Sequence, residues 1–166
     1  ENAPADEPVT DAEYSNLETE GCQSTTQGDP FMFRRAAQAM ESETFSGPVY
    51  VSTILEAENA AGAPSLRYVV FDEGVINNWH IHEGGQILIA TDGVGYHQIE
   101  GEPVQVLHPG DVAFCPPGAK HWHGGSADTQ FAHIAIDTNP ELTGLEWFDR
   151  ISPEEYGQLS AETSRP

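Results

Sequence analysis

The sequence predicts an all-β fold, an antiparallel barrel or jelly roll with short flanking helices. Short apolar runs of strand length recur from Val49 onward, and clusters of Gly, Pro, Asp and Asn separate them. No helix-length pattern alternates with these runs, which argues against a parallel α/β sheet. The expected strands are Val49–Glu56, Leu66–Asp72, Gln86–Thr91, Gly95–Ile99, Val104–Leu107, Val112–Cys115 and Phe131–Asp137.

Two short helices are expected outside these strands. Asp29-Pro30 places a capping Asp before a first-turn Pro, so we expect a helix from Phe31 to about Met40. Ser152-Pro153-Glu154-Glu155 is a cap followed by a first-turn Pro and two acids, which predicts a helix to about Leu159.

The 166 residues suit one domain with a sizeable core. We divide the chain into an acidic N-terminal tail (1–28), a short helix and lead-in (29–45), the barrel (46–140) and a C-terminal segment with a short helix (141–166). No run approaches the roughly 20 apolar residues of a membrane-spanning helix.

The balance of charge is strongly acidic. There are 27 Asp and Glu against 6 Lys and Arg, a formal net charge of −21. Such a surface repels phosphate backbones and anionic membranes, so we expect neither as a partner. The acids indicate a solvating surface suited to high salt, or else a charge-driven contact with a partner.

A candidate metal site begins at Trp79-His80-Ile81-His82. Residues two apart on a strand share a face, so both imidazoles point into the same space. Gln86 keeps this parity after the Gly84-Gly85 pair, which can bend the backbone. An antiparallel barrel can bring His121, which follows a Pro- and Gly-rich turn, beside these residues.

The same alternation of side chains between the two faces of a strand applies to other histidines. His123 lies two residues after His121, and His133 lies on an apolar strand, so both are candidates for acid–base work in the cavity. The alternatives are a supporting or rim role for His123 and a hydrogen-bonded core position for His133. We expect His97 to face outward and His108 to lie exposed in a turn.

Two spacings carry a family resemblance. The first cupin motif is similar to Gly74-(five residues)-His80-x-His82-(three residues)-Gln86-(six residues)-Gly93. The second resembles Gly110-(five residues)-Pro116-x-Gly118-x-x-His121. The resemblance implies a cupin β-barrel, also called a double-stranded β-helix. It also implies metal ligation by His80, His82, Gln86 and His121. Gln86 replaces the usual acidic ligand of the first motif, and Gly125 replaces the Asn that often ends the second.

The run His121-Trp122-His123-Gly124 followed by His133 narrows the resemblance. It is similar to small single-domain cupins related to manganese-dependent bacterial hydroxynitrile lyases, a group also associated with carboxymuconolactone decarboxylase-type proteins. This resemblance implies acid–base or substrate-binding roles for His123 and His133. It also implies one divalent transition-metal ion, Mn first, with Fe, Zn, Ni or Co as alternatives, because ligand type alone does not choose.

Three functions remain open at this point. A metal-dependent lyase acting on a small organic substrate comes first, because a neutral ligand set leaves the ion its full positive charge. A cupin dioxygenase is the second, since three histidines leave coordination positions open. A non-catalytic cupin that binds a small ligand or a metal is the third.

Assembly, cysteines and location complete the expectations. Cupins commonly pair through barrel edges, so we expect a homodimer. Cys115 lies in an apolar run and is expected to be a buried free thiol, the alternative being a disulfide with Cys22. The sequence begins at Glu1, so either a signal peptide has been removed, as in a periplasmic or secreted protein, or the sequence has been trimmed.

Overall fold

The computed structural model describes residues 33, 35–56 and 62–163. Ten strands and one helix, α2, make up the regular structure of these residues. Their bounds are β1 (Val49–Leu55), β2 (Ser65–Phe71), β3 (His80–His82), β4 (Gln86–Gly93), β5 (Gly95–Ile99), β6 (Gln105–Leu107), β7 (Val112–Cys115), β8 (Lys120–Gly125), β9 (Phe131–Asp137), β10 (Leu145–Trp147) and α2 (Pro153–Thr163).

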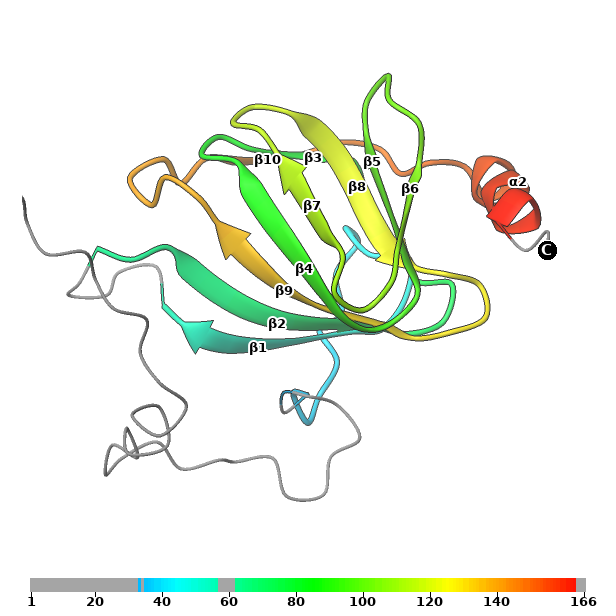
Figure 1. The fold of residues 1–166 in the computed structure, drawn as a ribbon, viewed down its shortest axis with the longest axis horizontal. Helices are drawn as coiled ribbons and strands as arrows, with labels where there is room; N and C mark the ends of the chain where they lie inside the picture. The colour runs from blue at the N-terminus through cyan, green and yellow to red at the C-terminus, as the bar shows by residue number, and fades with distance from the viewer. Residues whose placement is uncertain (1–32, 34, 57–61, 164–166) are drawn as a thin grey trace, which may run out of the picture.

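The strands form two antiparallel sheets, which confirms the all-β cupin barrel. The first sheet has the order β1-β2-β9-β4-β7 and the second the order β10-β3-β8-β5-β6. Figure 1 shows β1, β2, β9 and β4 side by side, and it shows α2 at the right-hand end of the molecule. Strands distant in sequence are therefore neighbours, because β9 lies between β2 and β4.

The core lies between the two sheets. Alternate residues of the strands point inward, and the largest apolar cluster joins β1, β2, β4 and β9 through Val49, Phe71, Leu88 and Phe131, none of which is exposed. Buried histidines on β3, β5, β8 and β9 interrupt this apolar interior, and they mark the candidate site.

Helix α2 begins as the sequence predicts. The Glu155 amide donates to Ser152 Oγ at 3.1 Å, and the Ser152 amide donates to Glu155 Oε2 at 2.7 Å, which is a reciprocal capping box. The Tyr156 hydroxyl donates to the Gly125 carbonyl at 2.8 Å, and its ring lies 6.0 Å from that of Tyr96. The helix therefore covers the outer face of β5.

The N-terminal helix expected over residues 31–40 is not formed where the structure describes it. Residues 35–40 contain bends and one isolated bridge, Met40 to Val49. A good local cap is not enough without a packing face. The segment is held instead by the bridge to β1 and by the Arg35 guanidinium, which lies 4.1 Å from the centre of the Tyr50 ring. Residues 29–32 lie outside the described residues.

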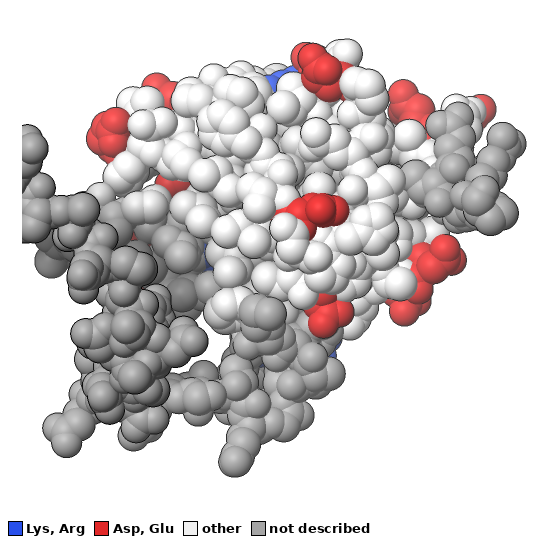
Figure 2. Space-filling model, viewed as in Figure 1, with Lys and Arg blue, Asp and Glu red and all other residues white. Residues whose placement is uncertain are grey.

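The first sheet carries an apolar outer face. Ile87 on β4 opposes both Phe114 and Ile136, and Ile89 opposes both Val112 and Ile134. We call these six side chains the apolar ladder. Val112 and Phe114 are 60% and 54% exposed. On the face of the molecule drawn in Figure 2, Asp and Glu are scattered and Lys and Arg are almost absent. No helix of the described residues is long and apolar enough to cross a membrane.

Candidate metal centre

The pairing of β3 with β8 brings three predicted ligands together. His80 lies directly opposite His121 in the register, and His82 follows on the same face of β3. One ring nitrogen from each of the three imidazoles lies within 4.8 Å of the others. His80 and His121 are almost fully buried, whereas the His82 side chain is 14% exposed.

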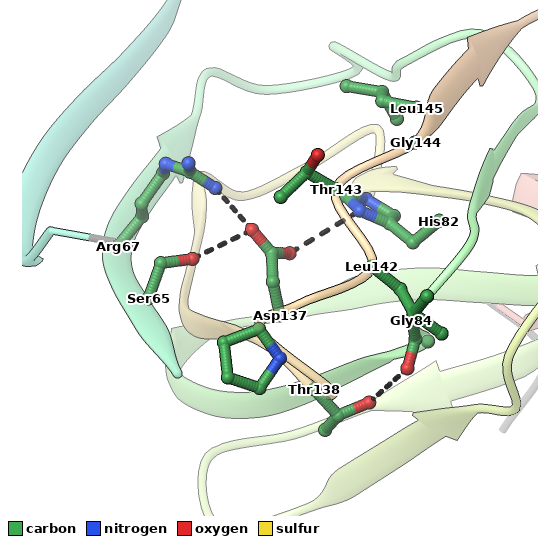
Figure 3. Close-up of a pocket in the computed structure, with 12 residues that line it drawn as sticks. Ser65, Arg67, His82, Gly84, Asp137, Thr138, Leu142, Thr143, Gly144 and Leu145 are labelled. Carbon is green, nitrogen blue, oxygen red and sulfur yellow. Dashed lines mark hydrogen bonds and ion pairs between the residues drawn. The ribbon is translucent and has the colours of Figure 1, made fainter. Parts of the chain in front are cut away.

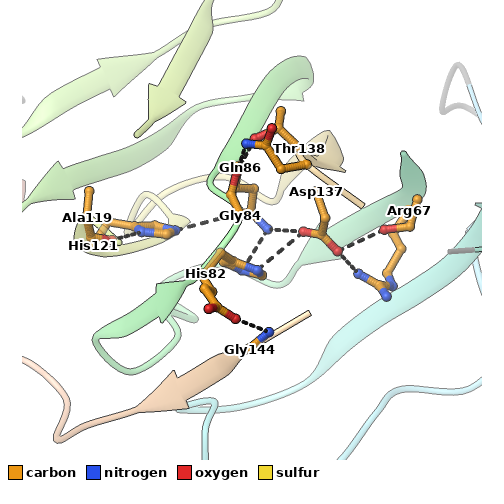
Figure 4. Close-up of polar contacts among 12 residues, drawn as sticks. Arg67, His82, Gly84, Gln86, Ala119, His121, Asp137, Thr138 and Gly144 are labelled. Carbon is orange, nitrogen blue, oxygen red and sulfur yellow. Dashed lines mark hydrogen bonds and ion pairs between the residues drawn. The ribbon is translucent and has the colours of Figure 1, made fainter. Parts of the chain in front are cut away.

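Backbone carbonyls orient two of these rings. His80 Nδ1 lies 3.0 Å from the Asn78 carbonyl oxygen, and His121 Nδ1 lies 3.0 Å from that of Ala119, as Figure 4 shows for His121. Since a carbonyl only accepts, each Nδ1 carries the proton and each Nε2 keeps a lone pair. Such carbonyl partners fix the tautomer of metal-binding histidines.

Gln86 reaches the cluster because the Gly84-Gly85 turn is tight. Gly85 has a φ of +83°, and a Cβ on Gly84 would lie 2.3 Å from the Thr138 carbonyl oxygen. Thr138 Oγ1 donates to the Gly84 carbonyl at 2.6 Å. This turn places the buried Gln86 side chain with Oε1 3.3 Å from His121 Nε2 and Nε2 2.9 Å from His82 Nε2.

A carboxylate that the sequence analysis missed lies behind Gln86. Asp137 accepts from Ser65 Oγ at 2.8 Å, Arg67 Nη1 at 2.6 Å and Gln86 Nε2 at 3.1 Å, and its Oδ1 lies 3.4 Å from His82 Nδ1. Burial raises the pKa of this carboxyl, but His82 and the three hydrogen bonds outweigh burial and lower it. Asp137 shares a strand face with His133, and that parity was the available signal.

The three imidazoles are neutral at neutral pH. Burial lowers the pKa of His121 to about 4 and holds that of His80 well below its usual range, and neighbouring histidines add to both shifts. For His82, burial also lowers the pKa, although Asp137 opposes it. Neutral imidazole is the form that binds metal, so three lone pairs and an amide oxygen fit a divalent transition ion.

His123 and His133 extend the cluster into the barrel. The His123 ring lies 5.4 Å from that of His80 and 5.1 Å from that of His133. The Asn77 amide nitrogen lies 3.2 Å from His123 Nε2, and Asn77 Oδ1 accepts from the His123 amide at 2.9 Å. His123 therefore has the supporting contacts weighed as an alternative, while its ring still faces the other histidines.

The surroundings of His133 are unusual. Its ring lies between those of Phe71 and Phe131, at 5.8 and 5.1 Å, and is fully buried. Neither ring nitrogen has a hydrogen-bond partner among the described residues. Burial, then His97, lowers its pKa to about 3. The alternative of a hydrogen-bonded core histidine is thus not supported by any protein partner.

The expectation for His97 was wrong. It is 1% exposed, with Nδ1 3.0 Å from Gln105 Oε1 and Nε2 3.0 Å from Cys115 Sγ. The cause is α2, because Tyr96 takes the covered outer face and leaves His97 inside.

Cys115 is a buried free thiol, as expected, and burial raises its pKa to about 12. Cys22 lies outside the described residues. His108 is exposed, as expected.

A second missed contributor is Trp147. The short strand β10 lies beyond the predicted barrel boundary at residue 140 and pairs with β3, so that Trp147 opposes His80. Their rings are 4.7 Å apart. Trp147 thus forms part of the wall around the candidate site.

An open pocket leads to the outer side of the cluster. It has a volume of about 150 Å³, and Figure 3 shows Arg67, His82 and Asp137 on its wall beside the loop that carries Thr143. The pocket therefore places the Asp137 network between solvent and the imidazoles.

Comparisons with known proteins agree with this geometry. Residues 67–136 match the family described as Cupin domain. The chain is 36% identical over 115 residues to an (R)-mandelonitrile lyase from Granulicella tundricola, covering 69% of this chain and 87% of that protein. A cupin-like protein from Thermotoga maritima superposes with a TM-score of 0.71 at 38% identity, covering 76% of this chain and 95% of that one. A cupin-2 domain from Rhodospirillum rubrum, with a TM-score of 0.57 at 18% identity over 74% and 79% of the two chains, shows the fold alone. The chain belongs to the cupin superfamily, with a resemblance within it to hydroxynitrile lyases.

Proposed function

We propose that this cupin is a metal-dependent lyase that cleaves or forms the carbon–carbon bond of a small cyanohydrin. The observation that carries the proposal is the neutral cluster of His80, His82, Gln86 and His121, together with the buried His133, whose ring nitrogens have no partner among the described residues. The relative at 36% identity that is named (R)-mandelonitrile lyase supports the substrate class.

The ligand set decides what kind of chemistry is favoured. A divalent ion held by three neutral imidazoles and an amide oxygen supplies a Lewis acid whose charge no ligand cancels. We propose Mn²⁺, with Fe, Zn, Ni and Co as alternatives. The carbonyl contacts of His80 and His121 keep their rings in place, so no reorganisation is needed when substrate binds.

We propose that His133 moves the proton, with His123 beside it. In the cleavage direction, a His133 nitrogen takes the hydroxyl proton as the bond to the nitrile carbon breaks. The oxygen keeps the electron pair of its O–H bond to form the carbonyl. The departing cyanide takes the carbon–carbon bond pair and then the proton that His133 returns, which leaves His133 neutral again. Burial lowers the pKa of His133 to about 3, so this ring is neutral at neutral pH and one ring nitrogen has a lone pair to receive the proton.

The experiment combines metal content with turnover. The full chain is purified without a tag, analysed for metals and assayed on mandelonitrile, beside His80→Ala/His82→Ala and an exposed-histidine control, His108→Ala. We expect near one transition-metal ion per chain, lost with activity only in the double variant. A chain that refuses Mn²⁺ and every alternative metal would overturn the proposal.

The same preparations separate the other two functions. Oxygen consumption with a panel of diketones, phenols and thiols, without cyanohydrin cleavage, would replace the lyase by a dioxygenase. A metal-loaded protein that keeps a small molecule through purification and turns over nothing would replace it by a binding cupin.

A further inference from the structure

We infer that Asp137 is a positioning residue for the candidate metal centre, the acidic group that sets the direction of the Gln86 amide and of the His82 ring. The inference rests on the proposed metal site and adds a residue to it. It depends on contacts that Asp137, which is not a proposed ligand, makes with two of the four proposed ligands (Figure 4).

The two carboxylate oxygens of Asp137 have separate partners. Oδ2 accepts from Ser65 Oγ at 2.8 Å and from Arg67 Nη1 at 2.6 Å, both on the neighbouring strand β2. Oδ1 accepts from Gln86 Nε2 at 3.1 Å and lies 3.4 Å from His82 Nδ1. One oxygen is thus anchored to the barrel wall, and the other faces two proposed ligands.

This arrangement selects one orientation of Gln86. A carboxylate only accepts hydrogen bonds, so the group of Gln86 that faces Asp137 must be its NH₂. The carbonyl Oε1 is then directed to the other side, where it lies 3.3 Å from His121 Nε2. An amide that could flip would present NH₂ to the ion half of the time and would be a poor ligand.

The same oxygen selects the tautomer of His82. With Nδ1 facing a carboxylate, the ring proton is placed on Nδ1, and Nε2 has the lone pair, which accepts from Gln86 Nε2 at 2.9 Å. Backbone carbonyls do this for His80 and His121, and Asp137 does it for His82.

The position of the charge follows from this network. Gln86 stands where the first cupin motif usually has an acid, and the structure has a carboxylate, Asp137, behind Gln86 and beside the Nδ1 side of His82. The negative charge remains nearby, but it is shared with Arg67 and does not reach the ion directly. The ligands of the proposed centre are therefore held in fixed orientations, although none of them carries a charge.

A swap of hydrogen-bonding roles tests the inference. Asp137→Asn lets the facing amide adopt either orientation, so we expect Mn²⁺ affinity to fall about 10- to 100-fold by titration calorimetry. Gln86→Glu alone places two carboxylates face to face and should also weaken binding. The double variant Gln86→Glu/Asp137→Asn restores a donor facing an acceptor, so we expect affinity to return to within about tenfold of the wild type.

Asp72→Asn is the matched control. Asp72 accepts from Gln130 Nε2 at 2.6 Å at the opposite end of the same sheet, so the control removes the same kind of contact far from the imidazoles. We expect it to leave Mn²⁺ affinity unchanged. Co²⁺ absorption gives a second readout, since loss of the amide oxygen lowers the coordination number and intensifies the visible bands.

The outcomes distinguish this inference from the proposed function. A wild-type chain that binds no metal overturns both. Wild-type Mn²⁺ affinity in Asp137→Asn, or no recovery in the double variant, overturns the positioning role and leaves the metal site standing. Should Asp137→Asn fail to fold, Asp137→Glu keeps the charge beside Arg67 but displaces the oxygen, and unchanged affinity there would overturn the role equally.

Discussion

Replacing His133 by Phe should stabilise the barrel and greatly slow its proposed chemistry. The ring of His133 is fully buried between Phe71 and Phe131, and neither nitrogen has a partner among the described residues. An unsatisfied buried polar group costs about 1–3 kcal/mol. Phe removes both nitrogens, although its larger ring has to fit into a packed core, which offsets part of the gain.

We therefore expect the free energy of unfolding to rise by about 1–2 kcal/mol, or roughly 2–8 °C in melting temperature for a domain of this size. Turnover of mandelonitrile should fall about 10²- to 10⁴-fold, the usual contribution of a general base, with one Mn²⁺ per chain retained. Thermal unfolding, metal analysis and turnover on one preparation measure all three.

His97→Phe is the control, because it also replaces a buried imidazole by Phe but breaks the contacts to Gln105 and Cys115. It should destabilise the protein by about 1–3 kcal/mol. Equal destabilisation in both variants would refute the reasoning about the unpaired nitrogens of His133. Full activity of metal-loaded His133→Phe would remove this ring from the proposed proton transfer.

Three further predictions follow from burial and charge. The folded pKa values of His121 and His133, about 4 and about 3, lie below the value near 6.5 in the unfolded chain, which therefore binds more protons as pH falls. The free energy of unfolding of the metal-free protein should thus drop by about 1.4 kcal/mol per pH unit for each such ring between pH 6.5 and 4, and a flat urea-unfolding profile would contradict this. If the apolar ladder joins two copies, light scattering should give twice 18.0 kDa for the wild type and one chain for Phe114→Glu, whereas a single-chain mass for the wild type would exclude the homodimer. Since burial raises the pKa of Cys115 to about 12, a thiol reagent at pH 8 should label the folded Cys22→Ser variant far more slowly than the same variant in urea, and rapid labelling of the folded protein would show that the thiol is accessible.

Much of the barrel follows from local pattern. Turn residues between short apolar runs predict β4, β5, β7 and β9 to within two residues at their ends. The period-two rule predicts that His80 and His82 share a face, and the family spacing adds His121 from a distant strand. The sequence is informative here because the face on which each of these residues lies depends only on the alternation within its own strand.

The wrong and missed predictions concern residues whose burial or contacts depend on another helix or strand of the fold. His97 was predicted to face outward, but α2 covers the outer side of β5, so that both faces of this strand are buried. Strand β10 has the sequence Leu145-Glu146-Trp147, too short to show a period, and only pairing with β3 defines it. Asp137 closes the expected strand, yet its importance depends on Gln86 and Arg67, which three different strands bring together.

The separation of surface charge from site charge explains how a chain with a net charge of −21 can keep an uncharged ligand set. Surface acids are screened over roughly 8–10 Å at ordinary ionic strength, and over less in high salt, so they contribute little to the field at the buried imidazoles. Asp137 is different, because it is only partly exposed and lies 3.4 Å from His82 Nδ1, well inside that distance. Its pairing with Arg67 offsets its charge locally. Its oxygens therefore affect the site more by orienting Gln86 and His82 than by adding negative charge. Metal affinity should therefore respond to a single substitution at Asp137 far more than to a change in salt concentration.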